Sequence, residues 1–148
     1  MMIKLNVIIR FAFVAVLTTV FASGCDDACE KTDLGRTIAV VFSIDAQVSS
    51  SVNGTEIFAK TVELRIYKEP CGQAPKGQFG WTALTDGTGY ATSGGSAYNM
   101  DNTDDLIVAT ATLLDGNNPS QTKTQTFRAS ELVQYDGNLK QIHFYFSL

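Results

Sequence analysis

Alternating apolar and polar residues mark two segments of the sequence as half-buried strands. In segment 61–68, the apolar residues Val62, Leu64 and Ile66 stand at every second position. A period of two puts alternate side chains on opposite faces of a strand, so these three are expected to face one core. Segment 141–148 has the same period. Its apolar face consists of Ile142, Phe144 and Phe146.

Five further segments have the composition of strands. Segments 37–45 and 106–114 are rich in β-branched and aromatic or aliphatic residues, and the second is apolar enough for a strand covered on both faces. Segments 81–85 and 90–92 are also expected to be extended, and the threonine-rich segment 122–127 is typical of a sheet edge. About seven strands are therefore predicted.

Residues that favour chain reversals separate these strands. Asn53-Gly54 is a strong hairpin signal, and 115–119 is a cluster of turn-forming residues that ends the strand before it. Asp86-Gly87-Thr88-Gly89 predicts a tight turn, because glycine adopts a positive φ at no steric cost and aspartate can accept backbone hydrogen bonds.

The remaining segments are predicted to be loops, apart from one helical turn. Residues 69–80 are rich in glycine, proline and lysine, and Gly94-Gly95 is expected to lie in a flexible loop. A helical turn can begin at 130–133, but no stretch after residue 24 keeps a helical apolar period over ten residues. Short strands at this spacing predict an all-β fold, a single β-sandwich.

The first 24 residues have the layout of a secretory signal peptide. Lys4 and Arg10 precede an apolar or small-residue stretch, 11–21, which is shorter than the roughly 20 residues that a membrane-spanning helix needs. The next four residues, Ala22-Ser23-Gly24-Cys25, resemble the lipobox of bacterial lipoproteins. The resemblance implies that the Cys25 thiol takes a diacylglyceryl group, whose fatty acyl chains include for example palmitate, and that the signal is cleaved before Cys25, which would anchor the protein to a membrane.

Position 22 departs from the lipobox pattern, because bacterial lipoproteins most often have leucine there and this chain has Ala22. Cleavage by an ordinary signal peptidase, after Ala22 or Gly24, is the alternative. It would give a secreted domain without lipid, in which Cys25 is a third thiol.

Removal of residues 1–24 leaves 148 − 24 = 124 residues, enough for one domain. The expected organisation is the signal peptide, a short acidic tether at 25–35 and a β-sandwich domain at 36–148. Lys4 and Arg10 leave with the signal, so 9 basic residues face 15 acidic ones, a formal charge of −6. Because nucleic-acid binding needs clustered lysine and arginine, nucleic acid is not an expected partner.

Two cysteines remain once Cys25 carries lipid. An exported protein leaves the reducing cytosol, so a disulfide between Cys29 and Cys71 is expected. A redox or metal site is less favoured, because the chain has no C-x-x-C pair and a single histidine, His143. The bridge would fasten the tether to the body of the domain.

The segment Val62–Tyr67, followed after a loop by Ala83–Thr92 with its T-D-x-x-G turn, is similar to carboxypeptidase-regulatory, transthyretin-like and bacterial Ig-like sandwiches. In those families the aspartate and glycine fix a hairpin, and 104–112 would match the strand that follows it. Segment 94–100 is longer and less apolar than is usual there, which leaves the strand order open. The resemblance implies a binding or spacer module without catalytic activity.

Few residues suggest catalysis. A serine hydrolase needs a histidine base, and His143 lies between the apolar residues Ile142 and Phe144, as an ordinary strand residue would. No catalytic residue and no cofactor are therefore expected. The acidic residues of the loop at 101–105 offer a carboxylate pair or oxygen ligands for Ca²⁺, but they lack EF-hand spacing and are expected to be solvated. These residues are Asp101, Asp104 and Asp105.

Aromatic residues near the central loops offer the remaining candidate binding site. Trp81, Tyr90 and Tyr98, together with Phe79, could form a platform for sugar or peptide, but buried packing is the favoured explanation. Metal ligands are not expected.

The leading hypothesis is a non-catalytic lipoprotein of the cell envelope. Lipid on Cys25 would tether it to a membrane, and its β-sandwich would bind or support an envelope protein or glycan. The alternatives are a sugar- or peptide-binding module that uses the loop aromatics and, less favoured, an enzyme with an unfamiliar carboxylate site. Asp26 and Asp27 resemble an inner-membrane retention signal in some bacteria and a surface-export signal in others, so the domain would face either the periplasm or the exterior.

Overall fold

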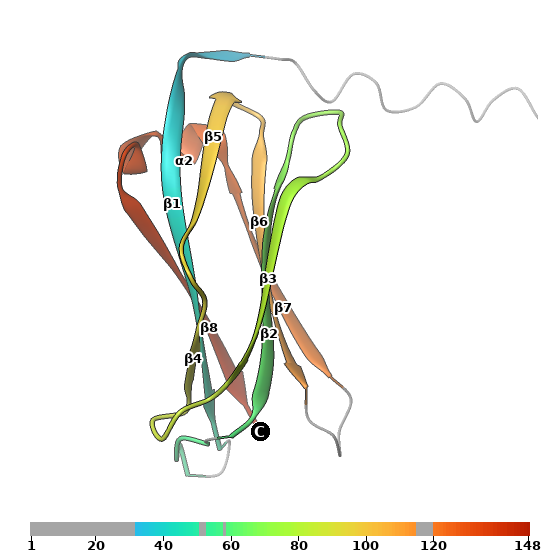
Figure 1. Ribbon diagram of the computed structural model, residues 1–148, viewed down its shortest axis with the longest axis vertical. Helices are drawn as coiled ribbons and strands as arrows, with labels where there is room; N and C mark the ends of the chain where they lie inside the picture. The colour runs from blue at the N-terminus through green and yellow to red at the C-terminus, as the bar shows by residue number, and fades with distance from the viewer. Residues whose placement is uncertain (1–31, 51–52, 58, 115–119) are drawn as a thin grey trace, which may run out of the picture. The chain divides into compact units, whose positions relative to one another are not determined.

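Two β-sheets share one apolar core in the computed structural model (Figure 1). The structure describes residues 32–50, 53–57, 59–114 and 120–148. The signal peptide, Cys25 and Cys29 lie outside these residues. The predicted all-β sandwich is confirmed, with eight strands where the sequence predicted about seven.

The strands are long relative to the connections between them. In chain order the elements are β1 (Asp33–Ser49), β2 (Thr61–Glu69), β3 (Lys76–Leu84), β4 (Tyr90–Thr92), β5 (Ser96–Asn102), β6 (Leu106–Leu114), β7 (Gln121–Arg128), the helical turn α2 (Ala129–Leu132), the 3-10 turn η1 (Val133–Tyr135) and β8 (Leu139–Ser147). No helix in the described part of the chain is both long and apolar enough to cross a bilayer.

β1 is the central strand of the first sheet. It pairs in antiparallel fashion with β5 through residues 38–42 and with β4 through 45–47, and in parallel with β8 through 41–49. The short segment between β4 and β5 is also hydrogen-bonded to β1. The amide of Ile44 donates to Ser93 Oγ at 2.8 Å, and the amide of Ser93 donates to Ile44 O at 2.8 Å. β4 and β5 therefore form one interrupted neighbour of β1.

The second sheet is antiparallel throughout, in the order β3-β2-β6-β7. β2 and β6 pair along their whole length, from Thr61 opposite Leu114 to Glu69 opposite Leu106. β7 lies at the edge of this sheet, as its polar, threonine-rich sequence predicted.

Side chains of β7 reach the neighbouring edge of the other sheet. Gln125 Nε2 donates to His143 O at 2.8 Å, and Lys123 Nζ donates to Tyr145 O. Both acceptors are backbone carbonyls of β8. Unpaired carbonyls on an edge strand invite pairing with another chain, so these two side chains protect the edge of β8.

The core is built from every second residue of β1. Ile38, Val40, Phe42, Ile44, Ala46 and Val48 are all buried, and the residues between them face outward. Val62, Leu64 and Ile66 of β2 and Ile142, Phe144 and Phe146 of β8 are buried on one face each, which confirms the two half-buried strands predicted from their alternation.

Three stretches of strand were missed or underestimated in the sequence. Residues 76–80, expected in a loop, form the first half of β3, and Ser96–Asn102 forms β5. Both contain few β-branched residues and are held extended by pairing with β2 and β1, which no local pattern reveals. β1 also begins at Asp33 and ends at Ser49, beyond the expected 37–45.

The predicted turns are present where the structure describes them. Gly54 has a φ of +67° in a reversal closed by the amide of Ser50 and the carbonyl of Thr55 at 2.7 Å. The helical turn predicted at 130–133 is confirmed by α2 and η1. The turn expected at 115–119 lies outside the described residues.

Candidate functional site

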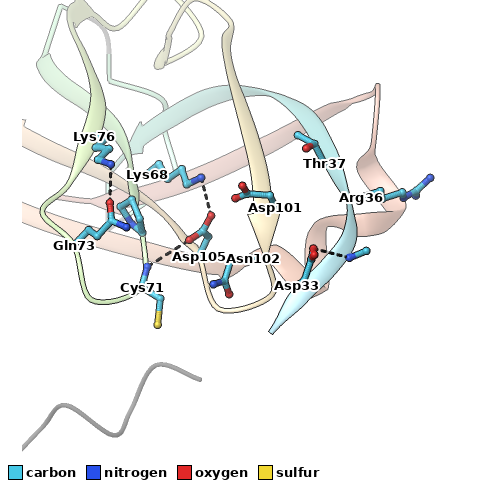
Figure 2. A pocket seen from close by; sticks show the side chains of 12 residues that line it. Asp33, Arg36, Thr37, Lys68, Cys71, Gln73, Lys76, Asp101, Asn102 and Asp105 are labelled. Atoms are coloured by element: carbon cyan, nitrogen blue, oxygen red, sulfur yellow. Dashed lines mark hydrogen bonds and ion pairs between the residues drawn. The ribbon is translucent and has the colours of Figure 1, made fainter. Parts of the chain in front are cut away.

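A cavity of about 690 Å³ lies at the end of the sandwich where β1 begins (Figure 2). Its walls come from the start of β1, the loop after β2, the start of β3 and the turn between β5 and β6. This end cavity is predominantly polar, and carries Lys68 and Lys76 beside Asp101 and Asp105. Its volume is within the range of pockets that hold small ligands.

The most buried charged group of the end cavity is Asp105. Its Oδ2 lies 2.7 Å from Lys68 Nζ, and the two side chains are 4% and 18% exposed. Lys68 Nζ also donates to Asn99 O at 3.0 Å, and Asp105 Oδ1 accepts the amide of Cys71 at 3.4 Å. The carboxylate therefore joins the end of β2 to the loop that follows it, as Figure 2 shows.

The other acidic residues of this turn contact different partners. Asp104 Oδ1 lies 3.2 Å from Arg128 Nη1, and Asp101 is exposed at the wall of the end cavity. The described residues contain no group of three or more histidine, cysteine, aspartate or glutamate side chains placed to hold a metal ion. Asp101, Asp104 and Asp105 are therefore close in the sequence but do not form one set of metal ligands in the structure.

Charges of both signs line the rim of the end cavity. Arg36 Nη2 lies 3.5 Å from Asp136 Oδ2, and Lys76 Nζ donates to Gln73 Oε1 at 2.7 Å. Asp33 Oδ1 accepts the amide of Gly35 at 2.9 Å. Because these charged groups already have partners within the protein, the arrangement suits a polar contact surface better than a centre that moves protons.

Three of the four candidate aromatic residues meet at one side of the sandwich. The rings of Phe79 and Trp81 stack with centroids 6.3 Å apart, and Phe79 meets the edge of Tyr98 at 6.0 Å. A Cβ on Gly94 would lie 3.4 Å from Trp81 Nε1, so the indole covers the break between β4 and β5. Among the described residues, no ring contact connects Tyr90 to this cluster.

Tyr98 belongs to the core rather than to an exposed platform. Its side chain is buried, and its hydroxyl lies 2.9 Å from Ile66 O and 2.5 Å from Gly77 O. Burial raises the pKa of Tyr98 to about 12, because the phenolate would lose its hydration. Tyr98 is therefore a neutral hydrogen-bond donor that joins β5 to β2 and β3.

His143 lies on the outer face of the first sheet with 48% of its side chain exposed. Its Nδ1 is 3.4 Å from Asp45 Oδ2, and Thr92 Oγ1 donates to Asp45 Oδ1 at 2.7 Å. The carboxylate thus lies between the hydroxyl and the imidazole. A hydrolytic triad needs the imidazole in the middle, so this order cannot activate the hydroxyl.

No known protein family, curated protein sequence or solved structure matches this chain. The residues and their geometry are thus the basis for a functional argument. The likeness to transthyretin-like and Ig-like sandwiches stays a prediction. So does the pairing of Cys71 with Cys29, because Cys29 lies outside the described residues.

One exposed feature could not be found in the sequence. Gln47 of β1 is directly opposite Tyr90 of β4 on one side and Tyr145 of β8 on the other. We call these three residues the tyrosine row. Tyr90 and Tyr145 are 55 positions apart in the sequence, and only the strand register brings them into one line.

Proposed function

We propose that this protein is a lipid-anchored, non-catalytic binding protein of the cell envelope. The observation that carries the proposal is the segment Ala22-Ser23-Gly24-Cys25, which directly follows an apolar leader too short to remain as a membrane span. Acyl chains on Cys25 would hold the protein at a membrane, and removal of the leader would leave one β-sandwich outside the cytoplasm.

The short tether supports a domain held close to the bilayer. Seven residues, 26–32, separate Cys25 from Asp33, the first residue of β1. An extended chain spans at most about 3.5 Å per residue, so the lipid and the sandwich would be within about 28 Å of each other. The predicted bridge between Cys29 and Cys71 would shorten this distance further.

Binding is favoured over catalysis by the chemistry of the exposed surfaces. The most buried carboxylate of the end cavity, Asp105, is neutralised by Lys68, and the Thr92, Asp45 and His143 side chains have the wrong order for a nucleophile and its base. The outer face of the first sheet offers exposed aromatic and polar side chains, among them Tyr90, Tyr145 and His143. Such a surface suits the recognition of a glycan or protein of the envelope.

Metabolic labelling with an alkyne fatty acid in a bacterial host tests the anchor. We expect the wild-type protein to carry the label and to sediment with membranes, and Cys25→Ser to do neither. Ser23→Ala is the matched control, because it keeps a small residue in the same segment and should be labelled normally. Mass spectrometry of the mature amino terminus that finds an unmodified Cys25 would refute the lipid anchor.

A second candidate function is a sugar-binding module, and the tyrosine row is the observation that favours it. The expectation that Trp81, Tyr90 and Tyr98 act together has to be modified, because Tyr98 is buried and Tyr90 lies on another surface. Trp81 and Phe79 cover one side of the sandwich, whereas Tyr90 and Tyr145 are exposed on a flat face.

A further inference from the structure

We infer that the outer face of the first sheet binds an extended, neutral, β-1,4-linked glycan along the tyrosine row. The inference rests on the proposed binding role, which it deepens by naming a ligand class, and it does not depend on the lipid anchor. Neither Tyr145 nor Gln47 is marked by any motif in the sequence.

The tyrosine row has the geometry of two aromatic supports with a hydrogen-bonding group between them. Residues directly opposite each other in neighbouring strands share one face of the sheet, so both tyrosine rings rise on the same side as Gln47. Tyr90 is 41% exposed and Tyr145 is 59% exposed. Two strand spacings separate them, about 10 Å, which is close to the length of a disaccharide.

The next row of residues supplies polar groups beside these rings. Asp45 is opposite Thr92 and His143, and all three lie on the outer face. Asp45 is fixed by Thr92 Oγ1 at 2.7 Å and by His143 Nδ1 at 3.4 Å, which leaves the partly exposed imidazole edge available to a ligand hydroxyl. Flat sugar faces pack on aromatic rings while their hydroxyls need polar partners.

The distribution of apolar residues on this face argues against a protein partner. Val41 and Leu139, 38% and 51% exposed, lie opposite each other. The polar pair Ser43 and Gln141 and the row around Asp45 separate them from the tyrosine row. A stable protein interface concentrates its apolar residues in a central desolvated patch, and here the centre is polar.

The position of the row along β1 would make it accessible to a polymer. Gln47 follows Ile38 by nine residues of regularly paired strand, about 30 Å at roughly 3.3 Å per residue. The row therefore lies toward the end of the sandwich opposite the end cavity. It is distant from Asp33, the first residue of β1, which the predicted tether would precede.

A binding assay on insoluble polysaccharides tests the inference. Full-length protein in mild detergent would be incubated with microcrystalline cellulose, chitin or purified peptidoglycan, and the bound fraction measured over a concentration series. We expect retention on cellulose or chitin, the two neutral polymers, and a roughly tenfold weaker affinity for Tyr90→Ala and for Tyr145→Ala; peptidoglycan, which carries carboxylates, is the charged comparison. Leu139→Ala is the matched control, because it removes an exposed apolar side chain from the same face outside the row.

Thermal unfolding by circular dichroism would establish that each variant is folded. Folded wild-type protein that binds neither cellulose nor chitin, or binding that both tyrosine variants keep, would overturn the inference. Loss of self-association in the tyrosine variants by sedimentation, without glycan binding, would overturn it in favour of a second copy as occupant. If the protein binds no glycan but still carries the fatty-acid label, the glycan inference fails and the proposed lipid anchor is unaffected.

Discussion

Burial in the core alters the acid–base chemistry of Tyr98. Its pKa is raised from 10.0 to about 12, because desolvation disfavours the phenolate. A raised pKa in the folded state means that the group contributes full stability below pH 10 and loses this contribution between pH 10 and 12. Alkali should therefore destabilise the fold through this side chain.

Spectrophotometric titration of the phenolates should reveal one tyrosine that ionises near pH 12, and this step should be absent from Tyr98→Phe. The free energy of unfolding of the wild type should fall between pH 10 and 12, and the slope should be smaller in the variant. At neutral pH we expect Tyr98→Phe to lower the free energy of unfolding by about 1 to 2 kcal/mol, since the carbonyls of Ile66 and Gly77 lose the hydroxyl that they share. Identical alkaline slopes would contradict this role.

Asp105 is the residue on which the end cavity depends for its shape. Asp105→Asn should lower the free energy of unfolding by about 2 to 3 kcal/mol, because Lys68 loses its counter-charge in a largely buried position. The loss in free energy of unfolding would be larger for a fully buried ion pair, but Lys68 keeps 18% of its side chain exposed. Urea unfolding followed by fluorescence would measure the difference.

Asp101→Asn provides the comparison within the same cavity. Asp101 is exposed, so its replacement should change stability by less than about 0.5 kcal/mol. Equal effects of the two substitutions would show that the Lys68–Asp105 pair does not hold this end of the sandwich together.

The turn before β4 is the element whose geometry is most tightly determined. The carboxylate of Asp86 accepts hydrogen bonds from the Thr88 hydroxyl and amide and from the Tyr90 amide, at 2.7, 2.8 and 3.1 Å. These bonds, that from the Thr88 hydroxyl first, hold the pKa of Asp86 below its usual 3.8. Gly89 closes the turn with a φ of +77° and packs against the carbonyl of Val48.

Gly89→Ala should destabilise the protein by about 2 kcal/mol or more, because its Cβ would lie 2.6 Å from Val48 O in a backbone conformation that alanine avoids. Gly87→Ala, two residues earlier in the same turn, should have little effect, because its Cβ would meet nothing within 4 Å and no positive φ is involved. Thermal denaturation of both variants would test this, and a smaller loss for Gly89→Ala than for Gly87→Ala would refute it.

At the scale of elements, the sequence predicted the strands that carry their own signal. β2, β6 and β8 were found because alternation or continuous apolar composition is visible in their residues. The start of β3 and all of β5 were not, because Gly77, Gly80 and polar residues there are extended only through pairing with β2 and β1. Local preference is weak evidence wherever a partner strand decides the conformation.

Candidate sites were less predictable than strands for the same reason. Tyr90 was identified from its aromatic chemistry, but its neighbour in the row, Tyr145, lies in the last strand. The parallel register of β8 on β1 cannot be predicted from the sequence of either strand. Likewise, Asp101, Asp104 and Asp105 are close in sequence but contact separate partners. The acidic residues that are close in sequence thus do not form one site in the fold. The tyrosine row, by contrast, is formed by residues that are far apart in the sequence.

At the scale of the whole domain, β1 connects the two candidate surfaces. The end cavity is built around its first residues, and the tyrosine row crosses it at Gln47. The same strand contributes six consecutive alternate residues to the core. Its rigid, paired backbone therefore fixes the distance between the end that would be tethered and the face that would bind.

The parallel pairing of β1 with β8, from Val41 to Ser49, has a mechanical consequence. A membrane tether would pull on the start of β1, and a polymer held at Tyr145 would pull on β8 near its far end. These opposed forces would act along the strands and load the hydrogen bonds between β1 and β8 in shear. Because the bonds of a parallel pair are evenly spaced, they would share the load instead of breaking one after another. With this strand arrangement, the domain would bear tension between a membrane anchor and a bound polymer.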